Sequence, residues 1–112
     1  RPTAVPTTIT MAVAAKATTY LGSVAADRAD YPRALALLPE AVRLARLAGE
    51  PRREAYALSM LGRLHLLRGD RDEAARLLDE AVALATAEHW LSFLPWPQAI
   101  RRWPGPDRPA PP

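Results

Sequence analysis

Two histidines are the residues of this chain best suited to metal binding or proton transfer. His65 lies within a run of leucines, and His89 stands beside Trp90. A protein metal site needs several ligands at defined spacings, and neither histidine has a second histidine or a cysteine at such a spacing. We therefore expect His65 to pack in a helix core and His89 to make a cap or a surface contact, with no metal ion and no cofactor.

Carboxylates cluster between Asp70 and Glu80, where they could form an acid–base pair or a calcium loop. The calcium-loop pattern, with its central glycine and terminal glutamate, is absent. Helix caps and solvated helix faces explain these acids. Ser23 and Ser59 lie in no nucleophile motif, and no glycine-rich phosphate loop occurs. We therefore expect that the protein is not an enzyme.

The elements that carry these side chains follow from hydrophobic spacing. Apolar residues at helical intervals predict a helix over 11–28 and a second over 31–48, which Gly49 ends. Pro51 suits the first turn of a third helix, which ends before the turn Arg68-Gly69-Asp70. A fourth helix follows Asp70. The sequence thus predicts two helical hairpins.

An internal repeat accounts for both hairpins, because the segments 15–54 and 55–94 agree at fourteen positions without a gap. Gly22 and Gly62 lie in the middle of helices, where glycine costs about 0.5–1 kcal/mol relative to alanine. We therefore expect a neighbouring helix to approach closely there. The small side chains of Ala34 and Ala74 are the expected partners.

Two further positions predict local geometry. Asp70 followed by Glu73 is a capping-box variant that would start the fourth helix. Pro39 falls inside the second helix and removes a hydrogen bond to the Leu35 carbonyl, so we expect a bend there.

The repeated positions resemble the tetratricopeptide repeat. The residues that carry the resemblance are Leu21, Gly22, Ala34, Leu38 and Ala41 in the first unit and Leu61, Gly62, Ala74, Leu78 and Ala81 in the second. The period of this repeat is longer than usual and is similar to that in the repeat region of large MalT-like, LuxR-type bacterial transcriptional activators. The resemblance covers about 15–100 and implies an all-α fold of tandem antiparallel helical hairpins, a tetratricopeptide-like α-solenoid fragment.

The resemblance also implies that the first helix of each hairpin lines a concave binding face. The residues that it places near this face are Lys16, Tyr20, Ser23, Asp27, Tyr56, Ser59, Met60 and Arg63. Tyrosine, methionine and arginine are common interface residues. The alternative, that these are ordinary solvent-facing side chains, stays open. The lysine and asparagine set by which some such repeats hold a terminal carboxylate is not present, so we expect no chaperone-tail clamp.

Composition and charge limit the classes of partner. The chain is 49% hydrophobic and 24% charged, as in a soluble globular protein, and it lacks cysteine, which fits a cytoplasmic location. Residues 11–94 hold eleven basic and eleven acidic residues, so the net charge of +3 comes from the ends. Without a basic stripe we expect no nucleic-acid binding by this segment. No apolar run reaches the roughly 18 residues that span a bilayer, so no membrane partner is expected.

The ends differ from the hairpins in composition. We expect a flexible lead-in at 1–10, two hairpin repeats at 11–94, and an incomplete third repeat with a proline-rich tail at 95–112. Pro97 could open a fifth helix, which Trp103-Pro104-Gly105-Pro106 would end. Residues 101–112 are either a genuine disordered tail or the product of a frameshift or truncation. Because the first residue is not methionine, the chain is either processed or part of a longer one.

These features predict a helical-repeat module for protein interaction or ligand sensing within a bacterial transcriptional regulator. Its partner would be a protein, a peptide or a neighbouring domain of the regulator. Two alternatives stay open: a regulator fragment without binding activity of its own, and a weak nucleic-acid binder that uses the basic tail. Two repeats leave open ends, so self-association is also expected. The residues expected at that surface are Leu66, Leu67, Trp90, Phe93 and Trp96.

Overall fold

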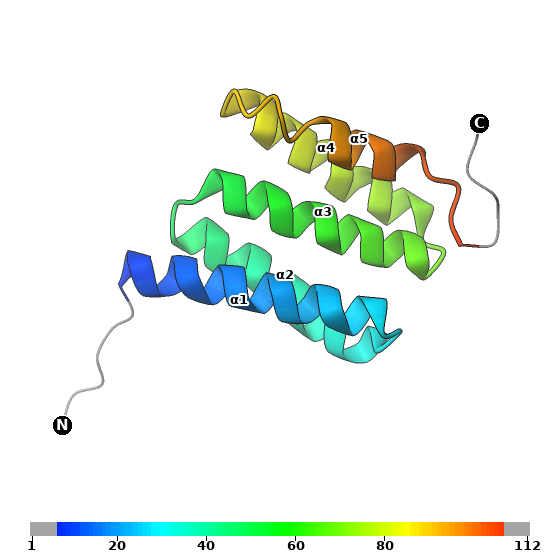
Figure 1. Ribbon diagram of the computed structural model, residues 1–112, viewed down its shortest axis with the longest axis horizontal. Helices are drawn as coiled ribbons and strands as arrows, with labels where there is room; N and C mark the ends of the chain where they lie inside the picture. Colours follow the sequence, from blue (N-terminus) through cyan, green and yellow to red (C-terminus); the bar gives the residue numbers. More distant parts are fainter. Residues whose placement is uncertain (1–6, 107–112) are drawn as a thin grey trace.

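Five α-helices make up the part of the chain that the structure, a computed structural model, describes, which is residues 7–106. They are α1 (Thr8–Asp27), α2 (Tyr31–Leu47), α3 (Pro51–Leu67), α4 (Arg71–Ala87) and α5 (Pro95–Arg102). The helices form two layers, with α1, α3 and α5 in one and α2 and α4 in the other (Figure 1). The prediction of an all-α stack of helical hairpins is confirmed.

The first helix begins at Thr8, three residues before the boundary that we expected at Met11. Thr7 caps it, because its hydroxyl oxygen accepts a hydrogen bond from the Thr10 backbone N–H at 3.1 Å. Residues 8–10 are therefore helical, which corrects the lead-in that we expected at 1–10. The rest of that segment, residues 1–6, lies outside the described residues.

Each of the first four helices ends in the same left-handed turn. The residues with positive φ recur at even spacing along the chain and are Ala29 (59°), Gly49 (66°), Gly69 (83°) and His89 (54°). The backbone N–H that follows each of them donates to a carbonyl five residues earlier, as Asp70 does to His65 at 2.8 Å. This is the Schellman helix ending, and glycine is its preferred residue because it has no Cβ to clash. His89 therefore does lie at a helix end, as expected.

Ala29→Gly is expected to raise the free energy of unfolding by about 0.5–1 kcal/mol, because it removes the strain of a left-handed alanine while adding some chain entropy to the unfolded state. Gly69→Ala makes the opposite change at the equivalent turn of the second hairpin and should lower the free energy of unfolding. Apart from the adjacent residues of the chain, no atom lies within 4 Å of a Cβ placed there, so backbone strain would be the main cause of its lower stability. Urea denaturation followed by circular dichroism measures both. Equal midpoints for Ala29→Gly and the parent chain would show that the left-handed conformation of Ala29 does not cost stability.

Aspartates begin the second helix of each hairpin. The Asp30 carboxylate accepts from the Arg33 N–H at 3.4 Å, and the Asp70 carboxylate accepts from the Glu73 N–H at 3.3 Å. The expected capping box is only half formed, because the Glu73 carboxylate pairs with Arg76 instead. In a full capping box the Glu73 carboxylate would accept a hydrogen bond from the Asp70 N–H. Here the Asp70 N–H already donates to the His65 carbonyl in the preceding turn.

The mid-helix glycines allow the two helices of each hairpin to approach closely. Both glycines are buried. A Cβ on Gly22 would lie 2.7 Å from Leu38 Cγ, and a Cβ on Gly62 would lie 2.8 Å from Leu78 Cγ. The expectation of a close helix contact is met, but the side chains that fill the space are the two leucines. As expected, Ala74 also lies at this contact, with its carbonyl oxygen 3.4 Å from the Cβ position of Gly62, whereas the three atoms nearest to the Cβ position of Gly22 belong to Leu37 and Leu38 and not to Ala34.

The helix α2 continues through Pro39 without a break. Pro39 is exposed, and it has no N–H to donate to the Leu35 carbonyl. The bend at Pro39 stays a prediction.

Arg46 of α2 links the two hairpins by bonding to acidic residues of α3 and α4. Its Nε donates to Glu54 Oε2 at 2.8 Å, and its Nη2 donates to Glu80 Oε1 at 3.1 Å. The hydrogen bond to Glu54 raises the pKa of the Arg46 guanidinium above its ordinary value, so this arginine stays charged. One side chain therefore ties together α2, α3 and α4.

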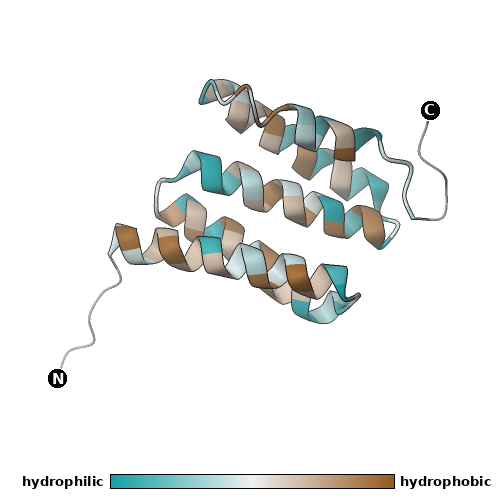
Figure 2. Ribbon diagram, viewed as in Figure 1, coloured by the Kyte–Doolittle hydropathy of each residue, from teal (hydrophilic) through white to brown (hydrophobic). Residues whose placement is uncertain are grey.

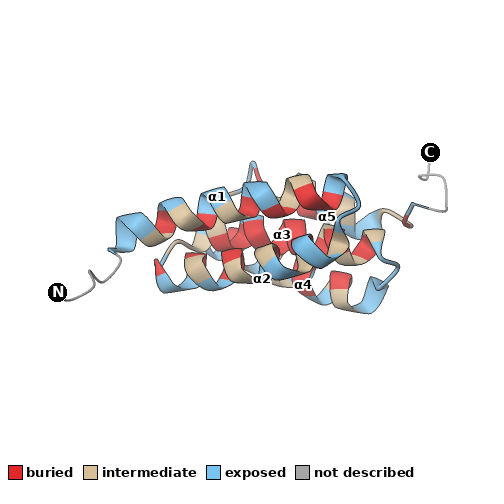
Figure 3. Cartoon of the chain, turned by 90° about the horizontal axis from the view of Figure 1, so that it is seen from below, coloured by how far each residue is buried: buried red, intermediate tan, exposed pale blue. Residues whose placement is uncertain are grey.

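The helix α3 lies at the centre of the packing. Ten of its 17 residues are buried, because α3 contacts α1 and α2 on one side and α4 and α5 on the other. Figure 3 shows α3 as a mostly buried helix between exposed ones. Hydrophobic and hydrophilic residues follow one another within the turns of the helices (Figure 2), as expected when one face of a helix packs and the other meets solvent.

The short helix α5 begins at Pro95 and ends at Arg102, after which residues 103–106 form no helix, as the prolines and Gly105 predicted. It covers much of the surface that we expected to be open, since Leu66 and Phe93 are 3% and 7% exposed. Leu67, Trp90 and Trp96 are half-buried. The expectation of an open surface at this end is therefore corrected. Residues 107–112 of the questioned tail lie outside the described residues, so its origin stays open.

Candidate functional site

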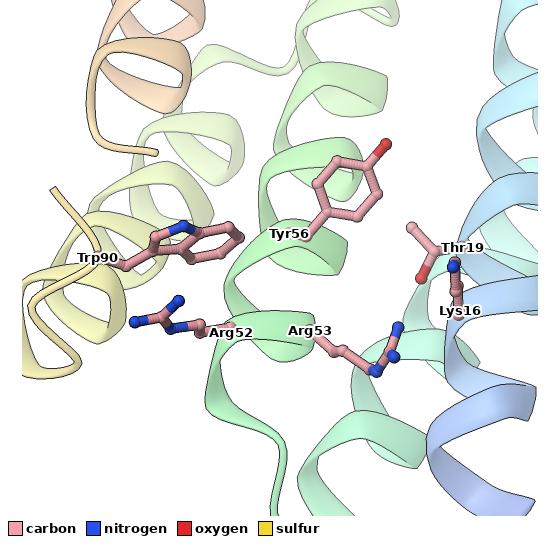
Figure 4. Close-up of a pocket in the computed structure, with 6 residues that line it drawn as sticks. All are labelled: Lys16, Thr19, Arg52, Arg53, Tyr56 and Trp90. Carbon is pink, nitrogen blue, oxygen red and sulfur yellow. The ribbon is translucent and has the colours of Figure 1, made fainter. Parts of the chain in front are cut away.

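A pocket of about 300 Å³ opens between α1, α3 and the segment that follows α4. Its lining residues are Lys16, Thr19, Arg52, Arg53, Tyr56 and Trp90. In the close-up, Arg53 and Tyr56 of α3 face Lys16 and Thr19 of α1, and Trp90 lies beside Arg52 on the other side (Figure 4). Three separate elements therefore form one site.

The pocket is positively charged. Lys16, Arg52 and Arg53 line it, and no carboxylate does. Within residues 7–106 none of these three cations forms an ion pair, whereas four of the eight other arginines in the hairpins do. The Arg52 guanidinium carbon lies 5.3 Å from the centre of the Trp90 ring, so a cation–π contact holds this arginine at the pocket wall. The site presents positive charge with no counter-charge of its own among the described residues.

Aromatic rings form the second part of the site. Tyr56 stacks on Trp96 with ring centres 5.2 Å apart, and Trp90 stacks on Phe93 at 4.2 Å. Phe93 meets Trp96 edge to face at 5.6 Å, so the four rings form one connected cluster. Such a cluster fixes the position of Tyr56 and Trp90 in the pocket wall.

Residues of the layer formed by α1, α3 and α5 recur with the 40-residue spacing of the repeat. Lys16, Tyr56 and Trp96 follow one another at intervals of 40 residues, on α1, α3 and α5. Trp96 stacks on Tyr56, and α5 begins 44 residues after the start of α3. The expectation of an incomplete third repeat stays a prediction.

The structure brings together two of the eight side chains predicted for the binding face, Lys16 and Tyr56. Arg63 and Asp27 pair with each other, with Nη2 donating to Oδ1 at 2.7 Å. Tyr20 is 69% exposed but does not line the pocket.

The remaining three predicted residues do not present free polar or apolar groups. Ser59 and Met60 are buried, at 0% and 7% exposed, because neighbouring helices cover that part of α3. The expectation that these two lie on an accessible face is corrected. The Ser59 hydroxyl donates to the Ala55 carbonyl at 2.9 Å, and the Ser23 hydroxyl donates to the Thr19 carbonyl at 2.8 Å. Both hydroxyls therefore satisfy their own helix.

Sequence reasoning missed Thr19, Arg52, Arg53 and Trp90. The two adjacent arginines after Pro51 are evident in the sequence, but the total charge of residues 11–94 is balanced and does not distinguish them. A count cannot show that acids and bases lie on different faces. The repeat offers a usable signal: Tyr56 matches Lys16, and residues 52 and 53 lie one helical turn before Tyr56. This spacing predicts that the two arginines lie near Lys16.

The residues with catalytic or metal-binding potential are dispersed. The His65 side chain is 15% exposed and packs as expected, with Nδ1 3.8 Å from Asp70 Oδ2. No group of three or more histidines and carboxylates with metal-binding geometry occurs in residues 7–106. Of the described helices, none combines the length and the apolar character that crossing a membrane requires.

Comparison with known proteins agrees with this architecture. A family model for the tetratricopeptide repeat matches residues 13–87, which include most of α1 and all of α2, α3 and α4. Searches among curated proteins and solved structures found no significant match. The family match spans both hairpins and about two thirds of the 112 residues. The chain therefore belongs to the tetratricopeptide-repeat family.

Proposed function

We propose that this protein is an interaction module whose pocket binds an acidic segment of a partner protein. Tetratricopeptide repeats are in general protein-interaction folds, and the site here lies on the layer formed by the first helices of the hairpins. The single observation that carries the proposal is the cluster of Lys16, Arg52 and Arg53, none with an ion-pair partner within residues 7–106.

The chemistry of the pocket favours a carboxylate next to an apolar group. Arginine and lysine donate charge-assisted hydrogen bonds to carboxylates. Tyr56 and Trp90 supply ring surface beside these donors, and such amphipathic rings are frequent binding anchors. An aspartate or glutamate flanked by an apolar side chain satisfies both parts at once.

The wider setting is part of the proposal. The repeat period, longer than that of the usual tetratricopeptide unit, supports a place in the repeat region of a MalT-like bacterial transcriptional activator, and hence in the cytoplasm. The acidic segment would then belong to a protein partner or to a neighbouring domain of the regulator. A regulator fragment without binding activity remains the competing interpretation.

Selection from a random peptide library followed by fluorescence anisotropy tests the proposal. Selected peptides are expected to be enriched in aspartate or glutamate beside an apolar residue. Arg53→Ala is expected to weaken their binding by about 10- to 100-fold, because each charge-assisted hydrogen bond contributes roughly 1.5–3 kcal/mol. Added salt should weaken binding further.

The matched control is Arg68→Ala, which removes an exposed arginine outside the pocket. Its affinity should equal that of the parent chain. If no peptide is selected, or if both arginine variants bind equally well, the pocket is not the site. Single-stranded DNA that binds more tightly than the peptides would favour the nucleic-acid alternative.

A further inference from the structure

Opposite charges connect the second hairpin to the first at two places. Near the end of α1, the Arg63 guanidinium of α3 donates to the Asp27 carboxylate at 2.7 Å. On the side of α2, the Arg46 guanidinium donates to the Glu54 carboxylate of α3 at 2.8 Å. Each contact pairs a cation of one hairpin with a carboxylate of the other, so each helps to hold α3 against the first hairpin.

A third place, in the pocket, brings like charges together. Lys16 of α1 and Arg53 of α3 are separated in sequence by one residue more than the ion pair between α1 and α3 is. Figure 4 shows the Arg53 side chain extending from α3 toward Lys16 and Thr19 of α1. Two cations therefore face each other across a pocket of about 300 Å³, and no carboxylate lines it. Along the contact between α1 and α3, the Asp27 end is closed by an ion pair and the Lys16 end is not.

The polar groups of the pocket differ in their freedom to bind an anion. The Arg52 guanidinium already packs over the Trp90 ring, 5.3 Å from its centre. The Thr19 hydroxyl donates its proton to a carbonyl of its own helix at 2.7 Å, so it has no hydrogen to give to a ligand. Within residues 7–106, neither Lys16 nor Arg53 has an ion-pair partner. These two cations, one from each hairpin, are therefore the donors best placed to share one anion.

We propose that the carboxylate of the acidic segment is held between Lys16 and Arg53, where it links α1 to α3 and strengthens the packing of the two hairpins. This link rests on the proposed function, since the acidic segment supplies the carboxylate. A carboxylate at this place satisfies one cation of each hairpin and offsets the repulsion between them. The helix α1 contacts α3 much less extensively than it contacts α2, so an added link between them has a large relative effect. The hairpin stack is therefore expected to be most rigid with its ligand bound.

Lys16→Glu tests the link without any ligand, because it supplies the carboxylate from α1 itself. Residues 12–20 contain no other charged residue, so the change creates no new ion pair within the helix. The midpoint of thermal unfolding is expected to rise by about 2–4 °C, because a repulsive pair becomes an attractive one. Lys16→Gln removes the charge without adding a carboxylate and has a similar helix propensity. It should give less than half of this rise.

Double-mutant cycles identify the cation that the new carboxylate meets. The rise from Lys16→Glu should vanish in an Arg53→Gln chain and persist in an Arg52→Gln chain, since Arg52 packs on Trp90 instead. The two backgrounds have the same net charge, so they are matched controls for each other. A rise that is equal in both backgrounds, or that Lys16→Gln reproduces in full, would overturn the link between Lys16 and Arg53. Peptide binding by the parent chain would be unaffected by that result.

Hydrogen exchange followed by mass spectrometry tests the link with the selected acidic peptides. At saturating peptide, amide exchange should slow several-fold both in α1 around Lys16 and in the first half of α3, because the anion holds both helices. Protection confined to α3 would overturn the link, although the pocket would still bind the peptide. No peptide binding by the parent chain, together with the expected rise for Lys16→Glu, would instead overturn the proposed function.

Discussion

Gly62→Val is expected to lower the free energy of unfolding by about 3 kcal/mol, because the new side chain has no space between α3 and α4. Even the Cβ would lie 2.8 Å from Leu78 Cγ and 3.1 Å from Leu78 Cδ2. Leu78 is fully buried and cannot swing into solvent. Overpacking therefore outweighs the gain in helix propensity that replacing glycine brings. Urea denaturation followed by circular dichroism measures the loss.

A double-mutant cycle with Leu78→Ala isolates the cause. Leu78→Ala alone should cost about 2–5 kcal/mol by leaving a cavity. Combined with Gly62→Val it should cost less than the sum of the two, because valine takes up space that the leucine has left. Ala36→Val is the control for placing a β-branched residue on an exposed helix position, with a cost of about 0.5 kcal/mol. Additive losses in the cycle would argue against a steric origin.

Leu58→Ala is expected to cost about 2–5 kcal/mol, the range for a fully buried leucine whose removal leaves a cavity. Leu58 is 1% exposed and lies in the core cluster that joins α1, α2, α3 and α4. A chain of this size has a total stability of only about 5–15 kcal/mol, so this one change removes a large fraction of it. The urea midpoint should fall accordingly.

Leu91→Ala provides the comparison, since this leucine is 65% exposed and should change stability by less than about 0.5 kcal/mol. Both variants should unfold in one step if α3 couples the two hairpins. Two separate transitions in Leu58→Ala, one for each hairpin, would show that the hairpins fold independently and that α3 does not act as the shared core.

Local signals account for what could be predicted. Gly22 and Gly62 indicated close helix contacts because mid-helix glycine is unfavourable unless something requires it. Asp30 and Asp70 marked helix starts because their carboxylates can accept free N–H groups within three residues. These effects act within one or two helical turns.

Other predictions were wrong where contacts between distant residues decide the outcome. Leu66 and Phe93 looked like an open end, but α5 and the segment before it pack over that surface. The exposed end is instead α1, where no preceding helix among the described residues covers Val13 and Leu21.

The sequence by itself determined the repeated hairpin, because the regular recurrence of glycine, alanine, leucine and capping aspartate specifies helices, turns and their packing faces through short-range interactions. Only the tertiary structure decided where the charge gathers. Lys16, Arg53 and Trp90 lie far apart in the sequence, yet they line one pocket. Their convergence depends on how one hairpin stacks on the next, which buries Ser59 and Met60 and leaves the cations at the surface. No local pattern encodes that arrangement, because it is set by the summed packing of α1, α3 and the segment after α4.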